Sequence, residues 1–166
     1  EDLQAGDCIL EAGRRLTAAD LGVIASTGRA ELNVKRPLRV AFFSTGDELR
    51  GVGEPLGPGE IHDSNRYSLY GMLTQLGVEV LDLGTIRDDP ETLAGALRQG
   101  ARDADAIVTS GGVSVGDTDH LPSLLGEHGE LLFRSIAMKP GRPVTVGRFD
   151  SAWYFGLPGN PVSVMT

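Results

Sequence analysis

The chain has 166 residues, of which 40% are hydrophobic and 23% are charged, which is enough for one globular domain with a sizeable core. This composition excludes a disordered chain and a collagen-like repeat, and a single cysteine, Cys8, excludes an internal disulfide framework. The net charge of −8 disfavours binding to nucleic acid or to an anionic membrane surface, and no apolar run is long enough to span a bilayer. We therefore expect a cytoplasmic protein without nucleic-acid or membrane partners.

Both ends of the chain suggest a segment of a longer protein. It begins at Glu1 without an initiator Met or a signal-like stretch, and it stops shortly after Pro161, where proline at a first helical position predicts a helix. Residues 1–36 are polar and mixed, with one short helix capped by Thr17. We interpret residues 1–36 as the remnant of a preceding domain or linker, and residues 37–166 as an α/β domain truncated at its C-terminus.

From residue 38 onwards, strands and helices are predicted to alternate. Apolar runs predict buried strands at residues 38–43, 78–83 and 105–109. A helical stripe of apolar residues follows each strand, and the first two of these helices begin at Asp63 or Ser64 and at Asp89. The stripes consist of Leu69, Met72, Leu73 and Leu76, of Leu93, Leu97 and Ala101, and of Leu121, Leu124, Leu125 and His128.

Three further strands are predicted at residues 130–137, 143–149 and 152–156, and the last strands are expected to be antiparallel to one another. Strands separated by helices of this length form right-handed crossovers, which place helices on both faces of a sheet. The sequence therefore predicts an α/β fold of three layers (α/β/α), with an open, mostly parallel sheet and an antiparallel hairpin near the end.

Carboxylates follow the first three predicted strands, at the edge where open parallel sheets bind ligands. Asp47 and Glu48 follow the first strand, Asp88 and Asp89 the second, and Asp119 lies in the loop after the third. If the strands are neighbours, these acids converge and repel one another unless a cation compensates their charge. Magnesium prefers oxygen ligands and is often completed by substrate phosphates, so the pattern predicts a magnesium site and a phosphorylated ligand.

Three of these acids, Asp47, Asp89 and Asp119, also have a structural alternative. Asp89 precedes a proline and is expected to cap a helix, which leaves Asp88 as the better metal or catalytic candidate. Asp47 can stabilise its turn, whereas Glu48 can reach farther into the edge of the sheet. Asp119 can serve the helix dipole alone.

Glycines and cations in the loops suit an anionic ligand. The Ser110-Gly111-Gly112 turn can expose backbone N–H groups beside a helix N-terminus, or it can be a tight strand-to-helix turn. Lys139 and Arg142, stiffened by two prolines, can form a cationic clamp for an oxyanion or a solvated hairpin tip. Residues 156–161 form a second rigid turn into a helix N-terminus, as a site for an anion or as a structural connection.

Six motifs, in this order, resemble the MoeA family, the molybdopterin molybdenumtransferases that include the gephyrin E domain. They are residues 44–49, 61–65, 86–90, 110–117, 138–143 and 156–161. The resemblance implies the MoaB/Mog-like molybdopterin-binding fold and a transferase of molybdenum cofactor biosynthesis. In that reaction molybdate is inserted into adenylylated molybdopterin, and AMP is released with the help of Mg²⁺.

Carried over motif by motif, the resemblance implies site residues and an assembly. The implied catalytic residues are Glu48, Asp88, Asp119 and Lys139, and the three carboxylates among them are the implied metal ligands. The implied substrate-binding residues are Thr45, Gly46, Asp47, Ser110, Gly111, Gly112, Ser114, Arg142, Pro158, Gly159, Asn160 and Pro161. Family members are multidomain homodimers, so we expect a homodimer of the full-length parent and reduced or absent turnover in this segment.

Two other functions stay open at this point. One is a molybdopterin adenylyltransferase of the MogA type or a CinA-like nucleotide-binding domain, although residues 112–116 differ from the threonine- and glycine-rich loop usual there. The other is a non-catalytic scaffold, as in the gephyrin relatives.

Overall fold

A computed structural model describes residues 4–112 and 120–165 of the chain. The chain divides into two compact units, Glu1–Arg36 and Pro37–Thr166. In the first unit, helix α1 (Ala18–Ser26) begins at Thr17, as predicted, and Thr17 and Asp20 form a reciprocal capping box. Arg14 adds an ion pair to Asp20. The second unit carries the cavity described below.

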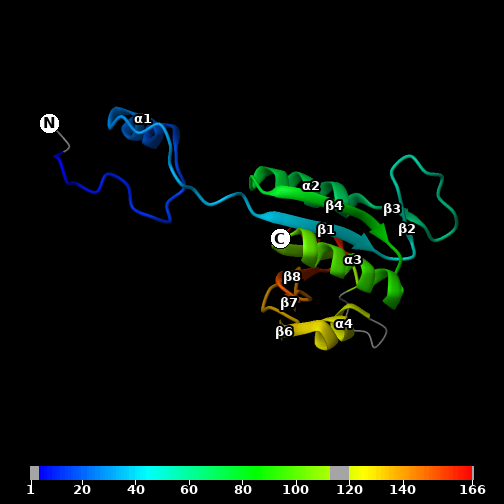
Figure 1. Ribbon diagram of the computed structural model, residues 1–166. Coiled ribbons are helices and arrows are strands. Elements are labelled where there is room, and N and C mark those ends of the chain that lie inside the picture. The colour runs from blue at the N-terminus through cyan, green and yellow to red at the C-terminus, as the bar shows by residue number, and fades with distance from the viewer. Residues whose placement is uncertain (1–3, 113–119, 166) are drawn as a thin grey trace. The chain divides into compact units, whose positions relative to one another are not determined.

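The second unit is built on a six-stranded sheet in the order β4-β1-β5-β8-β7-β6 (Figure 1). The strands are β1 (Arg39–Thr45), β4 (Glu79–Ile86), β5 (Ala106–Ser110), β6 (Gly129–Phe133), β7 (Thr145–Phe149) and β8 (Ala152–Leu157). β4, β1, β5 and β8 are parallel neighbours, whereas β7 is antiparallel to both β8 and β6. The predicted fold, a mostly parallel sheet ending in antiparallel strands, is confirmed.

Helices cover both faces of this sheet because successive residues of β1 point to opposite sides. Val40 and Phe42 pack against α2 (Ser64–Gln75) and α5 (Pro161–Val164) on one face. Ala41 and Phe43 pack against α3 (Pro90–Asp103) and α4 (His120–His128) on the other. Figure 1 shows α2 and α3 on opposite sides of β1. β1 is thus buried on both faces, as its nearly continuous apolar sequence indicates.

Helix α3 begins and packs as its sequence predicts. The Asp89 side chain accepts a hydrogen bond from the backbone N–H of Thr92, and a proline occupies the first turn. This bond from Thr92 lowers the pKa of Asp89 below its ordinary value. Leu93 and Leu97 are fully buried on the inner side of the helix, and each contributes about 2 kcal/mol through burial. The capping role expected of Asp89 is confirmed.

Gly100 lies where α3 packs closely against the sheet. A Cβ atom at residue 100 would lie 2.9 Å from Ile107 Cγ1 and 3.3 Å from Ala41 Cβ, whereas one at Gly95 would meet nothing within 4 Å. We expect Gly95→Ala to raise the free energy of unfolding by about 1 kcal/mol, because alanine favours the helix. Gly100→Ala should lower it by about 1 kcal/mol, because overpacking outweighs that gain. Urea unfolding of the two variants measures both effects, and equal stabilities would contradict the close packing.

The structure adds a second, small sheet that the sequence does not predict. β2 (Leu49–Arg50) pairs in parallel with β3 (Ile61–His62), and Arg50 forms an ion pair with Glu60 beside them. Strands of two residues leave no periodic pattern to detect.

The predicted ends of two strands are also wrong. β6 ends at Phe133 rather than at residue 137, and β7 begins at Thr145 rather than at residue 143. Pro143 has no N–H to donate to the ladder. The segment between the two strands therefore leaves the sheet earlier than its apolar residues suggest.

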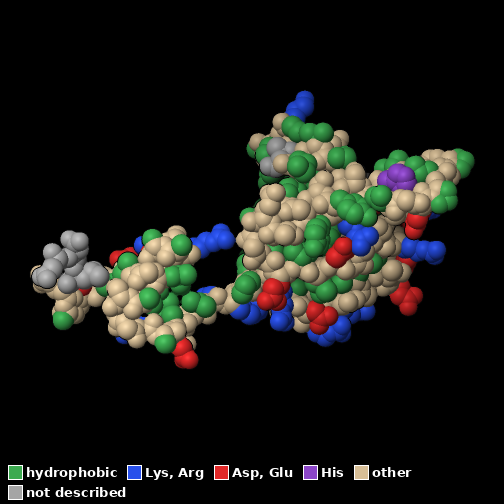
Figure 2. All heavy atoms as spheres, turned by 90° about the horizontal axis from the view of Figure 1, so that it is seen from above, with side chains coloured by type: hydrophobic (Ala, Val, Ile, Leu, Met, Phe, Trp, Pro, Cys, Tyr) green, Lys and Arg blue, Asp and Glu red, His purple; other side chains and the backbone are tan. Residues whose placement is uncertain are grey.

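The surface of the second unit mixes charges of both signs. Figure 2 shows acidic and basic side chains interspersed on one face. Several acids of this unit form ion pairs, including Asp82 with Arg66 and Glu79 with Arg39. Among the described residues, no helix has the length and apolar character needed to cross a membrane. Charges that act on a ligand are therefore best sought locally, at the edge of the sheet.

Candidate functional site

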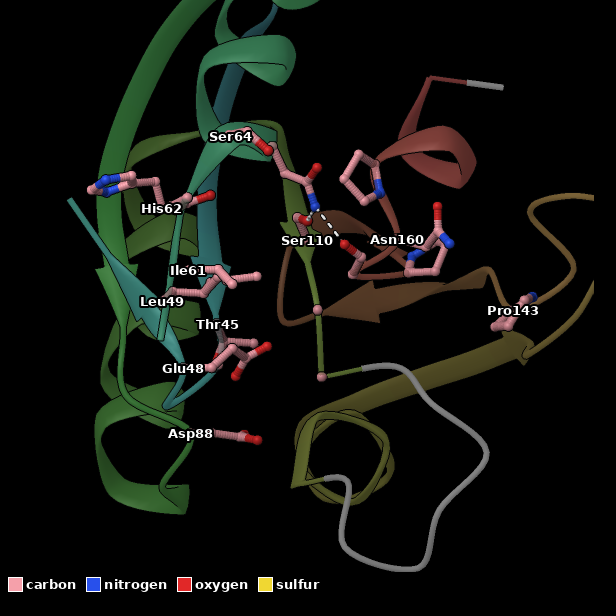
Figure 3. A pocket seen from close by; sticks show the side chains of 18 residues that line it. Thr45, Glu48, Leu49, Ile61, His62, Ser64, Asp88, Ser110, Pro143 and Asn160 are labelled. Carbon is pink, nitrogen blue, oxygen red and sulfur yellow. Dashed lines mark hydrogen bonds between the residues drawn. The ribbon is translucent and has the colours of Figure 1, made fainter. Parts of the chain in front are cut away.

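A cavity of about 420 Å³ lies at the carboxyl ends of the parallel strands (Figure 3). Segments that follow β1, β4, β5 and β8 line it, together with the first residues of α2. Eleven of the residues predicted as functional lie in its lining, namely Thr45, Gly46, Glu48, Asp88, Ser110, Gly111, Gly112, Pro158, Gly159, Asn160 and Pro161. The parallel register explains this convergence, because it brings the ends of neighbouring strands to one edge.

Two of the predicted carboxylates, Glu48 and Asp88, face this cavity. In Figure 3 both project into it from the same side as Thr45. Burial raises the pKa of Asp88, and the neighbouring charges of Asp47 and Glu48 raise it further, while His120 opposes the rise. The Oδ1 atom of Asp88 is buried and has no hydrogen-bond partner among the described residues. The site therefore disfavours the ionised form of Asp88 unless a cation or a donor approaches it.

The glycines after β5 are required by close packing. Gly111 and Gly112 have φ angles of +87° and +65°. A Cβ atom at residue 111 would lie 2.2 Å from the carbonyl oxygen of Thr45, and one at residue 112 would lie 2.7 Å from Leu121 Cδ1. Only glycine fits this turn, which brings the loop after β5 against the end of β1.

The prediction that the Ser110-Gly111-Gly112 turn exposes free backbone N–H groups is wrong at Gly111. Its N–H donates to the carbonyl oxygen of Leu157, at 3.0 Å, and so extends the pairing of β5 with β8. That donor is not available to a ligand. The two glycines thus shape the cavity by leaving room, and Gly111 does not line it with a free backbone donor.

The start of α2 forms a buried wall of the cavity. Asp63 caps the helix by accepting a hydrogen bond from the N–H of Arg66, and its carboxylate also accepts from Ser44 Oγ and Thr85 Oγ1, each at 3.0 Å. Asp63 is 2% exposed. It therefore ties α2 to both β1 and β4.

Asn65, in the first turn of α2, is a cavity residue to which the sequence analysis assigned no role. Its Nδ2 donates to Ser110 Oγ and to the carbonyl oxygen of Gly159, both at 2.8 Å (Figure 3, dashed lines). Leu49, Ile61, His62 and Ser64 also line the cavity without having been predicted. Most of these residues belong to the motif at residues 61–65, which leads into the first turn of a predicted helix. That motif could have indicated that they take part in the site.

The turn into α5 has one side chain already engaged. Asn160 caps α5, and its Oδ1 accepts a hydrogen bond from the N–H of Val162 at 2.9 Å. Pro161 occupies the first turn. Asn160 Oδ1 is therefore used in capping α5, and this turn contributes mainly prolines and backbone to the cavity.

The remaining predicted residues lie elsewhere. Asp47 lines an adjoining hollow of about 650 Å³ together with Arg50, Arg66 and Arg87. Arg142 lines a separate hollow beside Arg134, and both it and Lys139 are exposed and absent from the lining of the main cavity. Pro143 is the residue of that segment that reaches the main cavity. Ser114 and Asp119 lie outside the described residues.

The described part of the site could hold magnesium if the bound ligand supplied some of the oxygen atoms that coordinate the ion. Residues 4–112 and 120–165 contain no group of three or more His, Cys, Asp or Glu that could hold a metal ion. Glu48 and Asp88 offer two carboxylates on one side of the cavity, and Asp88 Oδ1 is free to coordinate. Magnesium is commonly held by one or two carboxylates plus substrate phosphates and waters, so this donor set is suitable.

Comparisons with known proteins agree on one family. The family described as "Probable molybdopterin binding domain" matches residues 41–166. The molybdopterin molybdenumtransferase of Haemophilus influenzae is 44% identical over 165 residues, which cover 99% of this chain and 41% of that protein. The protein of the same name from Nostoc sp. is 41% identical over 166 residues, covering 98% of this chain and 38% of that protein. The chain thus spans about two fifths of the length of these curated relatives.

Solved structures show the same fold. The molybdopterin biosynthesis MoeA protein from Pyrococcus horikoshii superposes with a TM-score of 0.76 and 34% identity, covering 93% of this chain and 38% of that one. The CinA protein from Thermoplasma acidophilum superposes with a TM-score of 0.62 over 78% of this chain and 92% of that one. At 15% identity, the second likeness shows the fold alone.

Proposed function

Because the chain belongs to the family of probable molybdopterin binding domains, we propose that it is the molybdopterin-binding part of a molybdopterin molybdenumtransferase. In this role it serves molybdenum cofactor biosynthesis. Adenylylated molybdopterin binds in the 420 Å³ cavity, molybdate is the second substrate, and AMP is released. The observation that carries the proposal is the convergence of Glu48, Asp88 and the Gly111-Gly112 turn on that one cavity.

Electrostatics support a phosphorylated ligand that arrives with a divalent cation. The chain has a net charge of −8, and the carboxylates of Glu48 and Asp88 face the cavity, so a bare phosphate would be repelled. A cation shared between the carboxylates and the ligand removes this repulsion.

Glu48 and Asp88 are the described residues that would hold Mg²⁺, with Asp119 as a further ligand from the sequence prediction. When bound, the ion supplies Lewis-acid stabilisation of the charge on the pyrophosphate linkage. Lys139 and Arg142 are proposed to offset the charge of the incoming molybdate.

The setting of the reaction follows from the same family. We propose that the full-length parent is a homodimer in the cytoplasm and that Ser114 and Asp47 contribute to ligand binding there. Because the chain spans about two fifths of its relatives, it is expected to bind ligand without completing the reaction.

The test uses the full-length parent and this chain in parallel. Adenylylated molybdopterin, molybdate and Mg²⁺ are supplied, and AMP release is followed by chromatography. The parent should release AMP only when molybdate and Mg²⁺ are both present, whereas the 166-residue chain should bind the ligand in calorimetry. Adenylylation of molybdopterin from ATP would instead identify an adenylyltransferase. Failure of the chain to bind adenylylated molybdopterin would reject the proposal.

A further inference from the structure

Asn65 holds three segments of the cavity wall together. It lies in the first turn of α2, behind the Asp63 cap that joins this helix to β1 and β4. Its side-chain amide reaches Ser110 at the end of β5 and Gly159 in the turn after β8. The residue is 8% exposed and lines the cavity. Its position is therefore set by contacts on several sides.

These contacts also determine which way the amide points. The carbonyl oxygen of Gly159 can only accept a hydrogen bond, so the atom of Asn65 that lies 2.8 Å from it must be the Nδ2 donor. The second Nδ2 hydrogen is used by Ser110 Oγ, also at 2.8 Å. Both donors of the amide are thus consumed within the protein, and Oδ1 occupies the remaining position.

Oδ1 of Asn65 is an acceptor without a donor. It is buried and has no hydrogen-bond partner in the described part of the chain. A buried amide oxygen is rarely left unpaired, because its lost hydration is not replaced. Thr45 Oγ1 is also unpartnered in the same cavity, but a hydroxyl can either donate or accept and so places no demand on the ligand.

An acceptor of this kind discriminates between parts of a ligand. Oxygens of a phosphate or pyrophosphate are acceptors too, and they would leave Asn65 Oδ1 unsatisfied. A hydroxyl or amino group would satisfy it. A site built to pair with a donor strongly rejects an analogue that lacks it, because the buried group is then left unpaired.

We infer that Asn65 is a specificity-determining residue whose Oδ1 accepts a hydrogen bond from an uncharged hydroxyl or amino group of the ligand. The inference rests on the proposed function, and it adds that the nucleoside or pterin portion, and no phosphate oxygen, lies against the start of α2. The phosphates are then expected on the side of Glu48 and Asp88, the described residues that would hold Mg²⁺.

The test compares the affinities of the wild type and Asn65→Leu in the 166-residue chain. The probes are adenylylated molybdopterin, AMP and sulfate, which carries acceptors only. We expect Asn65→Leu to weaken adenylylated molybdopterin about tenfold or more and to leave sulfate unchanged. A parallel loss for AMP assigns the donor to the nucleoside, whereas unchanged AMP affinity assigns it to the pterin, and both outcomes support the inference.

Two controls separate recognition from support of the fold. Thr109 precedes Ser110 on β5 and does not line the cavity, and its hydroxyl shares a buried hydrogen bond with Tyr154. Thr109→Val removes this bond, so it should lower the free energy of unfolding and leave ligand affinity unchanged. If Asn65→Leu fails to fold, the same affinities are measured with Asn65→Ser.

The possible failures differ from one another. Equal affinity of wild type and variant for adenylylated molybdopterin, or an equal loss for sulfate, overturns the role of Asn65 while leaving the proposed function intact. Absence of ligand binding by the wild type overturns both.

Discussion

Gly111→Ala should lower the free energy of unfolding by about 4 kcal/mol or more and abolish ligand binding. The added Cβ atom would lie 2.2 Å from the carbonyl oxygen of Thr45, and neither partner is a flexible side chain that can move aside. The loop after β5 would have to leave the end of β1, which opens the cavity. Thermal and urea unfolding measure the first effect, and calorimetry with adenylylated molybdopterin measures the second.

Gly84 provides a matched control because its φ angle is also +87°. A Cβ atom there would meet nothing within 4 Å, so Gly84→Ala carries only the backbone penalty of about 1–2 kcal/mol. The difference between the two variants isolates the contact with Thr45. If Gly111→Ala proves no less stable than Gly84→Ala, the close approach of the two loops is wrong.

Asp88→Asn is expected to reduce AMP release by the full-length parent by about 100-fold or more, because it removes a charged oxygen ligand from the proposed magnesium site. The fold should not suffer. Burial and the charges of Asp47 and Glu48 raise the pKa of Asp88, so the folded state disfavours its ionised form. Asp88→Asn should therefore be at least as stable as the wild type at neutral pH.

The pH dependence of stability tests the sign of this effect. Since the folded pKa of Asp88 lies above its ordinary value of 3.8, the folded state holds the proton more tightly than the unfolded state. Its contribution to stability is therefore present at low pH and is lost as the pH rises from 3.8 through the raised value. In urea unfolding at a series of pH values from 3.8 upwards, Asp88→Asn should not show this loss of stability.

A neighbouring variant controls for damage to the loop. Asp89→Ser keeps an oxygen that can cap α3, and Asp89 does not line the cavity, so AMP release should stay near that of the wild type. Wild-type rates in Asp88→Asn, or an equal loss in Asp89→Ser, would argue against a specific role of Asp88.

The sequence predicts the fold well because its main signals are local. The run at residues 38–43 is buried on both faces of β1, and the acid before Pro90 caps α3. The loops that follow neighbouring parallel strands meet at one edge of the sheet, so the sequence indicates where the cavity lies. Glu48 and Asp88 follow from that rule.

Other features depend on contacts between residues far apart in the chain. Asn65 owes its orientation to Gly159, which lies 94 residues away, and no local pattern carries that information. The N–H of Gly111 is consumed by Leu157 because β5 and β8 are neighbours, a pairing that spacing alone does not give. Arg142 illustrates the same limit, since a stiff turn does not indicate which hollow the side chain lines.

The three hydrogen bonds accepted by Asp63 make the two sides of the cavity mechanically unequal. The bond from Arg66 N–H lies within the helix, but to swing α2 outward the chain would have to break the bonds from Ser44 in β1 and Thr85 in β4 together. The side of the cavity formed by α2 is therefore held in place. Pro143 lines the opposite side of the cavity, where the chain between β6 and β7 has left the sheet, so we expect a bulky ligand to enter from that side (Figure 3).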